Sequence, residues 1–224
     1  YDDKSIEVED FGRGCPVDWN PAEKRFNWEL VYCELYAGGK YKNDDGGDYE
    51  YSLGLNGLGA CATQYASEYM DVTVWRDGNK YTLHFAKGKI KGKMLVEPSD
   101  RKKTGTTTRW KPDIEVFTDI NIPESYFLDI LRRQAVVNAG VTFRFRAQHG
   151  AKFETTEFCY KNGIADYVAE LAGESPLTQP YYIETERKGK DREDKPEYKV
   201  RMSAAFCFSN RTNAIEYYHN SSWL

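Results

Sequence analysis

The alternation of apolar and polar residues predicts several strands, and the clearest of them form a hairpin. Residues 70–88 contain two alternating runs around Asp77-Gly78, a residue pair typical of a tight turn. Residues 4–9 alternate in the same way and predict a half-buried strand. Residues 104–113 are rich in threonine and predict a further strand, which a proline ends.

Helical spacing of apolar residues appears in four other places. After Asn20-Pro21 it predicts a helix that Asn20 caps and Gly38-Gly39 ends. The other predicted helices follow the glycines of residues 54–60, span residues 125–140, and span residues 163–173. Residues 141–148 predict a strand with arginines on one face, and residues 175–210 predict two strands joined by a charged loop at 187–195. This order is α+β rather than a regular βαβ ladder.

Composition and charge exclude several classes of protein. The chain has 224 residues and a net charge of −4, which argues against a wholly basic nucleic-acid coat. A hydrophobic content of 40% excludes a disordered chain, and no apolar run or leader pattern predicts a membrane helix or a signal peptide. Five cysteines without a CxxC pair indicate reduced thiols rather than disulfides or a zinc site. No P-loop is present.

Two glycine-containing loops are the candidates for chemistry. The first, residues 10–16 (DFGRGCP), is called the glycine loop below, and its Asp10 could accept a hydrogen bond from the exocyclic amine of adenine. The second, residues 54–59 (GLNGLG), precedes a helix and could cradle phosphates, with Lys40 adding a charge. Taken singly, each pattern also fits an ordinary turn, helix start or helix end.

Lysines at alternate positions of residues 87–93 would share one face of a strand. They fit a solvated edge that discourages aggregation, or a surface that contacts phosphates.

Six stretches in order resemble one known family: VEDFGRGCPVD, ELYAGGKY, LGLNGLGACATQYAS, KTGTT, WKPDIEVF and LRRQAVVNAGVTFRFR. They resemble the N-terminal ATPase region of bacterial type II DNA topoisomerases, the B subunits of gyrase and topoisomerase IV, over essentially the whole chain. The resemblance implies an α+β fold of the GHKL superfamily, the Bergerat two-layer α/β sandwich, with helices on one mixed sheet. It places an ATP-binding domain at residues 1–172, without its first helix, and the start of a transducer domain at residues 173–224.

The same resemblance implies an ATP site. Asp10 matches the aspartate that binds the adenine amino group, and Thr106 matches a threonine that reaches adenine through water. Cys15 and Val31 fall where apolar residues line the base, and Arg76 falls at the mouth of the pocket. The other matched residues are Gly12, Arg13, Gly14 and Pro16 of the glycine loop, Gly38, Gly39 and Lys40 near the phosphates, and Gly54, Leu55, Asn56, Gly57, Leu58 and Gly59 of the lid that wraps the phosphates.

Three positions depart from the family pattern. Tyr36 stands where the family has a histidine before the AGGK motif. Asn56 stands in place of a histidine but can still donate a hydrogen bond, and Leu53 replaces a glycine that would act as a hinge. In the family, the general-base glutamate and a magnesium-holding asparagine lie on a helix upstream of the DxGRG motif, and residue 1 follows that helix. We therefore expect no catalytic or metal-ligating residue in this piece and no ATP hydrolysis by it alone.

For the whole protein, the resemblance implies that ATP and Mg²⁺ drive closure of a dimer gate and DNA strand passage. The implied partners are DNA, a gyrase A-like cleavage subunit and a second copy of the protein, in the cytoplasm and without a membrane. Two alternatives stay open. One is another GHKL ATPase of the mismatch-repair, chaperone or histidine-kinase type, and the other is a degenerate, non-catalytic nucleotide-binding or dimerisation module.

Overall fold

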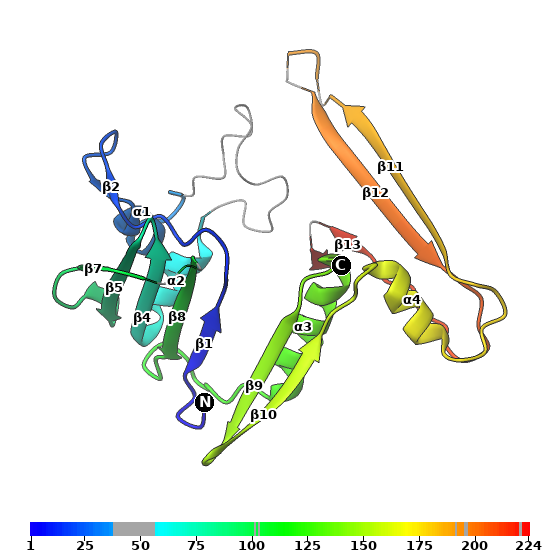
Figure 1. Cartoon of the computed structure of the whole chain (residues 1–224), viewed down its shortest axis with the longest axis horizontal. Helices are drawn as coiled ribbons and strands as arrows, with labels where there is room; N and C mark the ends of the chain where they lie inside the picture. The colour runs from blue at the N-terminus through cyan, green and yellow to red at the C-terminus, as the bar shows by residue number, and fades with distance from the viewer. Residues whose placement is uncertain (38–56, 101, 103, 191, 195–196, 220) are drawn as a thin grey trace. The chain divides into compact units, whose positions relative to one another are not determined.

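The structure is a computed structural model that describes residues 1–37, 57–100, 102, 104–190, 192–194, 197–219 and 221–224. These residues form two compact units (Figure 1). The first unit is Tyr1–Ile122 with Gln148–Phe153, and the second is Pro123–Ala147 with Glu154–Leu224. Neither limit of these units falls between residues 172 and 173. The expected boundary between an ATP-binding domain and a transducer domain at that point stays a prediction.

A six-stranded sheet is the centre of the first unit (Figure 1). In spatial order its strands are β1 (Ile6–Glu9), β8 (Gly105–Pro112), β4 (Ser67–Arg76), β5 (Asn79–Ala86) and β6 (Lys89–Ile90), and β7 (Leu95–Pro98) also pairs with β5. Strands far apart in the sequence are therefore neighbours, as where Val8 lies opposite Thr108. Every described pair in this sheet is antiparallel, so this part of it is not the mixed sheet that the resemblance implied.

The predicted hairpin at Asp77-Gly78 is confirmed. Asp77 has a φ of 51° and Gly78 a φ of 73°, as the tight I′ turn between two strands requires. Arg76 and Asn79 pair directly across the turn, which fixes the register of β4 against β5. Met70, Val72 and Val74 therefore all point to the same buried face of the sheet.

Two short helices cover this face. α1 (Asn27–Cys33) packs on it through Tyr32, and α2 (Gly59–Tyr65) contacts both α1 and β4. The core of the first unit consists of Val17, Tyr32, Met70, Val72, Val74, Leu83 and Phe85. Burial of these side chains is the main stabilising contribution to the unit.

The helix expected from Asn20-Pro21 begins only at Asn27, so its predicted start is wrong. Asn20 Oδ1 accepts hydrogen bonds from the N–H groups of Ala22, at 3.0 Å, and Glu23, at 3.2 Å. This asparagine therefore caps a turn, which joins β2 (Trp19–Asn20) to β3 (Arg25–Phe26). α1 ends at Cys33, and the expected stop at Gly38-Gly39 lies outside the described residues.

The lysines of residues 87–93 do not share one strand face, and that prediction is wrong. Among them only Lys89 lies in a strand, the short β6. Lys87 has a φ of 47°, and its Nζ lies 2.7 Å from Glu115 Oε1. Gly92 has a φ of 77°. With Gly88, whose φ is 75°, three left-handed residues thus interrupt the extended backbone that a common face requires.

The second unit contains the two helices that amphipathic spacing predicted. α3 (Glu124–Val137) and α4 (Ile164–Ala172) pack around a core of Ala135, Val136 and Tyr160. The predicted stop of α3 at Gly140 comes shortly after its observed end, and Gly140 N–H donates to Tyr160 O at 2.9 Å. The predicted arginine-bearing strand is β9 (Phe143–His149), which pairs with β10 (Lys152–Phe158).

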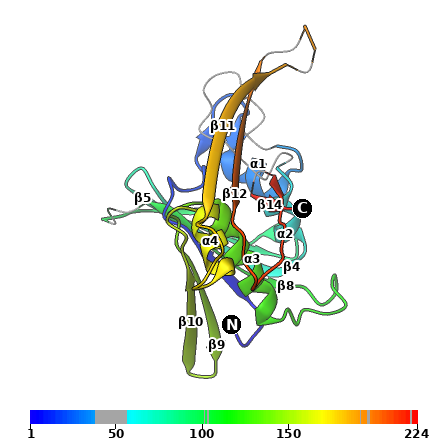
Figure 2. The same ribbon diagram turned by 90° about the vertical axis from the view of Figure 1, so that its right-hand side faces the viewer.

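A long hairpin in the second unit forms a two-stranded sheet of its own (Figure 2). It joins β11 (Tyr181–Gly189) to β12 (Tyr198–Phe206), so the first residues of the expected charged loop belong to β11. One face carries cross-strand ion pairs such as Arg201 with Glu184 at 3.3 Å, and the other carries apolar side chains such as Ile183. The remaining strands are β13 (Tyr218–His219) and β14 (Ser222–Trp223). Within the described parts of the chain, no helix is long and apolar enough to span a membrane.

Candidate functional site

The glycine loop leaves the end of β1 and is fastened to the start of β8. Asp10 N–H donates to Thr106 O at 2.9 Å, which extends the β1–β8 ladder by one residue. Cys15 N–H donates to Thr106 Oγ1 at 2.9 Å. Thr104 Oγ1 donates to Gly12 O at 2.6 Å. The loop is thereby fixed to β8 at its beginning, middle and end, so its backbone forms a defined surface.

Two glycines are needed for this close fit. Gly14 has a φ of 80°, and a Cβ on it would lie 2.7 Å from Trp75 O. Gly105, at the first position of β8, has a φ of 148°, and a Cβ there would lie only 2.1 Å from Asp10 O. A side chain at either position would meet backbone that cannot rotate away. Gly14 was a predicted site residue, whereas Gly105 was not.

Asp10 lies at the exposed end of β1, rather than in a buried position. Its Oδ1 accepts the N–H of Gly12 at 2.8 Å, which places the carboxylate at the entrance of the loop. Among the described residues, the structure gives no hydrogen bond to the second carboxylate oxygen, Oδ2. One oxygen thus orients the group while the other is available to accept a hydrogen bond from a ligand.

Apolar and basic side chains adjoin the loop. Cys15 and Val31 are half-buried, and both pack against the core cluster of the first unit. Arg76, at the end of β4, donates from Nη1 to Gly14 O at 3.2 Å and from Nε to Asp77 Oδ2 at 3.0 Å. The structure therefore brings Asp10, Gly14, Cys15, Thr106 and Arg76 to a single loop.

The other predicted residues divide into three groups. Gly12, Arg13 and Pro16 lie in the exposed part of the glycine loop. Gly57 has a φ of 61° and belongs to the turn before α2, which begins at Gly59 as expected. Leu58 lies between them at the helix N-cap. Gly38, Gly39, Lys40, Gly54, Leu55 and Asn56 lie outside the described residues.

Burial keeps two protic groups below the loop neutral. Burial raises the pKa of the Cys15 thiol, and the nearby charge of Asp10 acts in the same direction. Burial also raises the pKa of the Tyr32 hydroxyl well above its usual value. At neutral pH the floor beneath the loop therefore carries no ionised thiol or phenol. It could contact a planar, uncharged base, but it offers no reactive nucleophile.

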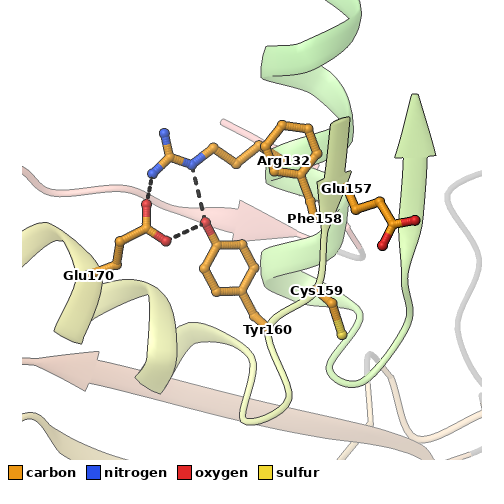
Figure 3. A pocket seen from close by; sticks show the side chains of 6 residues that line it. All are labelled: Arg132, Glu157, Phe158, Cys159, Tyr160 and Glu170. Atoms are coloured by element: carbon orange, nitrogen blue, oxygen red, sulfur yellow. Dashed lines mark hydrogen bonds and ion pairs between the residues drawn. The ribbon is translucent and has the colours of Figure 1, made fainter. Parts of the chain in front are cut away.

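The second unit contains a shallow cavity of about 350 Å³, lined by Arg132, Glu157, Phe158, Cys159, Tyr160 and Glu170 (Figure 3). Its polar groups satisfy one another. Arg132 Nε donates to Tyr160 Oη at 3.2 Å, and Tyr160 Oη donates to Glu170 Oε2 at 2.8 Å. Arg132 also forms an ion pair with Glu170. This network joins α3 to α4, and none of the predicted site residues lies in it.

Sequence reasoning missed residues that hold the glycine loop from below. Thr104 and Gly105 lie within the KTGTT stretch, but no side-chain role was expected of them. Tyr32, beside Val31 in the predicted helix, belongs to the core cluster against which Cys15 packs, and spacing alone assigns it no role. The run of three threonines in GTTTRW is a signal that could have indicated two hydroxyls, those of Thr106 and Thr108, on one face of β8.

No protein-family model matches the chain. Individual proteins of known identity do match it. The chain is similar to the B subunit of DNA topoisomerase 4 from Salmonella typhimurium, with 34% identity over 175 residues that cover 78% of this chain and 27% of that protein. It is similar to the B subunit of DNA gyrase from Thermus thermophilus, with 35% identity over 184 residues, 81% of this chain and 28% of that protein. The chain thus spans only about a quarter of these relatives' length.

Solved structures of the same two kinds of protein are also similar to this chain. The 43K ATPase domain of Thermus thermophilus gyrase B, solved with an aminocoumarin, matches with a TM-score of 0.66 and 31% identity, over 86% of this chain and 47% of that one. The topoisomerase IV ATP-binding domain of Francisella tularensis, solved with a small-molecule inhibitor, matches with a TM-score of 0.62 and 25% identity, over 84% of this chain and 51% of that one.

Proposed function

This chain belongs to the ATPase-domain family of the B subunits of bacterial DNA gyrase and topoisomerase IV, and on that premise we propose that it binds ATP with the glycine loop against the adenine base. Asp10 Oδ2 accepts the amino group of adenine, and Thr106 reaches the base through water. Cys15 and Val31 contact its faces and edges. Arg76 lies at the mouth of the pocket, with Gly12, Arg13, Gly14 and Pro16 shaping the loop.

The observation that carries this proposal is the attachment of the loop to β8. Three hydrogen bonds, from Asp10, Cys15 and Thr104, fix the loop before any ligand arrives. The carboxylate of Asp10 is oriented by Gly12 and keeps one oxygen for a donor. A preorganised acceptor beside a neutral, partly apolar wall suits a purine with an exocyclic amine.

On the phosphate side, we propose that Gly38, Gly39 and Lys40 and the lid end Gly54, Leu55, Asn56, Gly57, Leu58 and Gly59 surround the triphosphate. The left-handed φ of Gly57 supports a turn that only glycine adopts easily. Among the described residues, no group of three or more His, Cys, Asp or Glu side chains could hold a metal ion. We assign the Mg²⁺ that accompanies ATP no ligand in these residues, because the resemblance places a magnesium-holding asparagine on a helix upstream of the glycine loop.

For the whole protein, we propose that ATP binding and hydrolysis close a dimer gate and drive DNA strand passage in the cytoplasm. The partners would be DNA, a gyrase A-like cleavage subunit and a second copy. Because the resemblance places the general base upstream of the glycine loop, we propose that these 224 residues bind ATP without hydrolysing it. The alternative of a degenerate, non-catalytic module rests on Leu53 and Asn56.

Isothermal titration of the 224-residue chain with a non-hydrolysable ATP analogue tests the proposal. We expect saturable binding that Asp10→Ala weakens by about tenfold or more, since a hydrogen bond to a charged acceptor is lost. A phosphate-release assay on the same protein should show no turnover. Heat changes without saturation would contradict ATP binding, and turnover at ordinary enzymatic rates, about 1 per second or faster, would contradict the placement of the general base outside these residues.

A further inference from the structure

Thr104 reaches the glycine loop from the position just before β8. Its Oγ1 donates a hydrogen bond to Gly12 O at 2.6 Å, within the normal range for a hydroxyl and a carbonyl oxygen. The next residue, Gly105, lies against the same part of the loop, since a Cβ on it would be 3.2 Å from Phe11 Cα. The segment that enters β8 therefore runs alongside residues 10–12 and holds their backbone.

Gly12 links Thr104 to the carboxylate of Asp10. Its N–H donates to Asp10 Oδ1 at 2.8 Å, a turn in which an aspartate side chain binds the backbone two residues further on. A Cβ on Gly12 would lie 3.1 Å from the same oxygen, so the carboxylate packs closely against this glycine. Thr104 thus holds Gly12, and Gly12 holds Asp10. The direction of the carboxylate depends on a hydroxyl that does not touch it.

The backbone of Asp10 is fixed separately, by Thr106. Asp10 N–H donates to Thr106 O at 2.9 Å, which determines where the side chain begins. The carboxylate is at an exposed position and could still rotate about its two side-chain torsions. The hydrogen bond from Gly12 restricts this rotation only while Gly12 itself is held. Thr106 therefore places Asp10, whereas Thr104 orients its carboxylate.

Stability alone gives little reason for the Thr104 hydroxyl. Thr104 is exposed, so water could replace Gly12 O as its partner at small cost. The turn between Asp10 and Gly12 is local and does not require a residue from another strand to form. The contact should therefore matter mainly for the direction in which the carboxylate points.

We infer that Thr104 is a positioning residue that fixes Gly12 and thereby aims the free oxygen of Asp10 at the amino group of the purine. This inference rests on the proposed function, because it names what orients the acceptor in the same site. A fixed acceptor favours a purine that carries a donor, since no rotation has to be frozen when the ligand binds. Thr104 thus contributes to the selection of aminopurines.

The main test is Thr104→Val in the 224-residue chain, which keeps the branched shape and removes only the hydroxyl. Isothermal titration should show ATP binding about three- to tenfold more weakly, the effect of a less well oriented hydrogen bond. Purine riboside triphosphate, which lacks the amino group, should bind with unchanged affinity. Thr104→Ser restores the hydroxyl and should restore the preference for ATP. Thr104→Ala takes the place of Thr104→Val if the latter does not fold.

Thr107→Val is the matched control. Thr107 belongs to β8 as well, but successive residues of a strand point to opposite faces, so its side chain lies on the face away from buried Thr106. The control should change the affinity for neither nucleotide. Amide hydrogen exchange at Gly12 gives a readout without nucleotide, and it should be about threefold faster or more in Thr104→Val and unchanged in Thr107→Val.

A double-variant cycle tests whether Thr104 acts through Asp10. In an Asp10→Ala background, Thr104→Val should cause no further loss of ATP affinity, whereas an independent structural effect would add in full. If the unchanged chain binds ATP and Thr104→Val keeps the same preference for it, or loses both nucleotides equally, the inference is overturned while ATP binding stands. If the unchanged chain binds neither nucleotide, the proposed function itself fails. Unchanged exchange at Gly12 in Thr104→Val would separately overturn the positioning role.

Discussion

Replacing Gly105 by alanine should detach the glycine loop from β8. The added Cβ would lie 2.1 Å from Asp10 O and 3.1 Å from its carbonyl carbon. Ordinary contact between non-bonded heavy atoms lies at about 3.5 Å, so the two segments must separate by about 1 Å or more. The crowded atoms belong to the backbone, and no side-chain rotation can relieve the overlap.

The size of the effect follows from the contacts that this separation breaks. Asp10 N–H and Cys15 N–H both donate to Thr106, the residue after Gly105, at 2.9 Å. Each bond contributes about 1 kcal/mol net. A φ of 148° adds about 1–3 kcal/mol of strain for any residue except glycine. Gly105→Ala should therefore destabilise the first unit by about 3–5 kcal/mol.

Urea unfolding followed by tryptophan fluorescence measures this loss, with amide hydrogen exchange at Asp10 and Cys15 as a local readout. Gly92→Ala is the matched control. Its φ of 77° brings strain, but a Cβ there meets nothing within 4 Å, so it should cost only about 1–2 kcal/mol. If Gly105→Ala is no more destabilising than Gly92→Ala, and the two amides exchange as before, the proposed attachment of the loop to β8 is wrong.

Two further predictions concern the cores of the two units. Val72→Ala, at a fully buried position of β4, should destabilise the first unit by about 2–3 kcal/mol in the same urea assay, and a loss below about 1 kcal/mol would contradict the core assignment. In the second unit, burial and a hydrogen bond to Glu216 raise the pKa of Tyr167 to about 12, above its unfolded value of about 10. Because the folded state holds this proton more tightly, its stabilising contribution is complete below pH of about 10 and is lost as the pH rises through about 12. Tyr167→Phe should remove that part of the alkaline destabilisation in circular dichroism titrations, and an unchanged alkaline profile would contradict it.

Short sequence patterns correctly predicted the turns and helices whose conformation depends on the residues within them. The Asp77-Gly78 hairpin is confirmed because both residues adopt left-handed backbone that the turn needs. α3, with 14 residues, and the shorter α4, with nine, are confirmed because apolar residues recur in both at helical spacing. The helix start at Asn20 was wrong because an asparagine caps turns as well as helices, and only the partners of its Oδ1 distinguish the two.

The site was predictable only as far as the resemblance carries it. The resemblance identified Asp10, Gly14, Cys15 and Thr106, which the structure brings to one loop. Thr104 and Gly105 hold the loop only because this segment meets it in the folded chain, so no spacing in the sequence indicates their role. The prediction that the lysines of residues 87–93 share one strand face was wrong for a related reason. The alternation of residue types did not show that Gly92 interrupts the extended backbone.

The central claim is that the Asp10 carboxylate accepts a hydrogen bond from the amino group of adenine. Its most direct test compares the binding of ATP with that of purine riboside triphosphate, which lacks this amino group, in the unchanged chain and in Asp10→Asn. With its carbonyl oxygen on Gly12 N–H, asparagine presents an NH₂ group to the ligand in place of Oδ2, and this donor cannot accept the amino group of adenine. We predict that the unchanged chain prefers ATP by about tenfold or more, and that Asp10→Asn binds both nucleotides about equally. A preference for ATP that survives in Asp10→Asn would contradict the account.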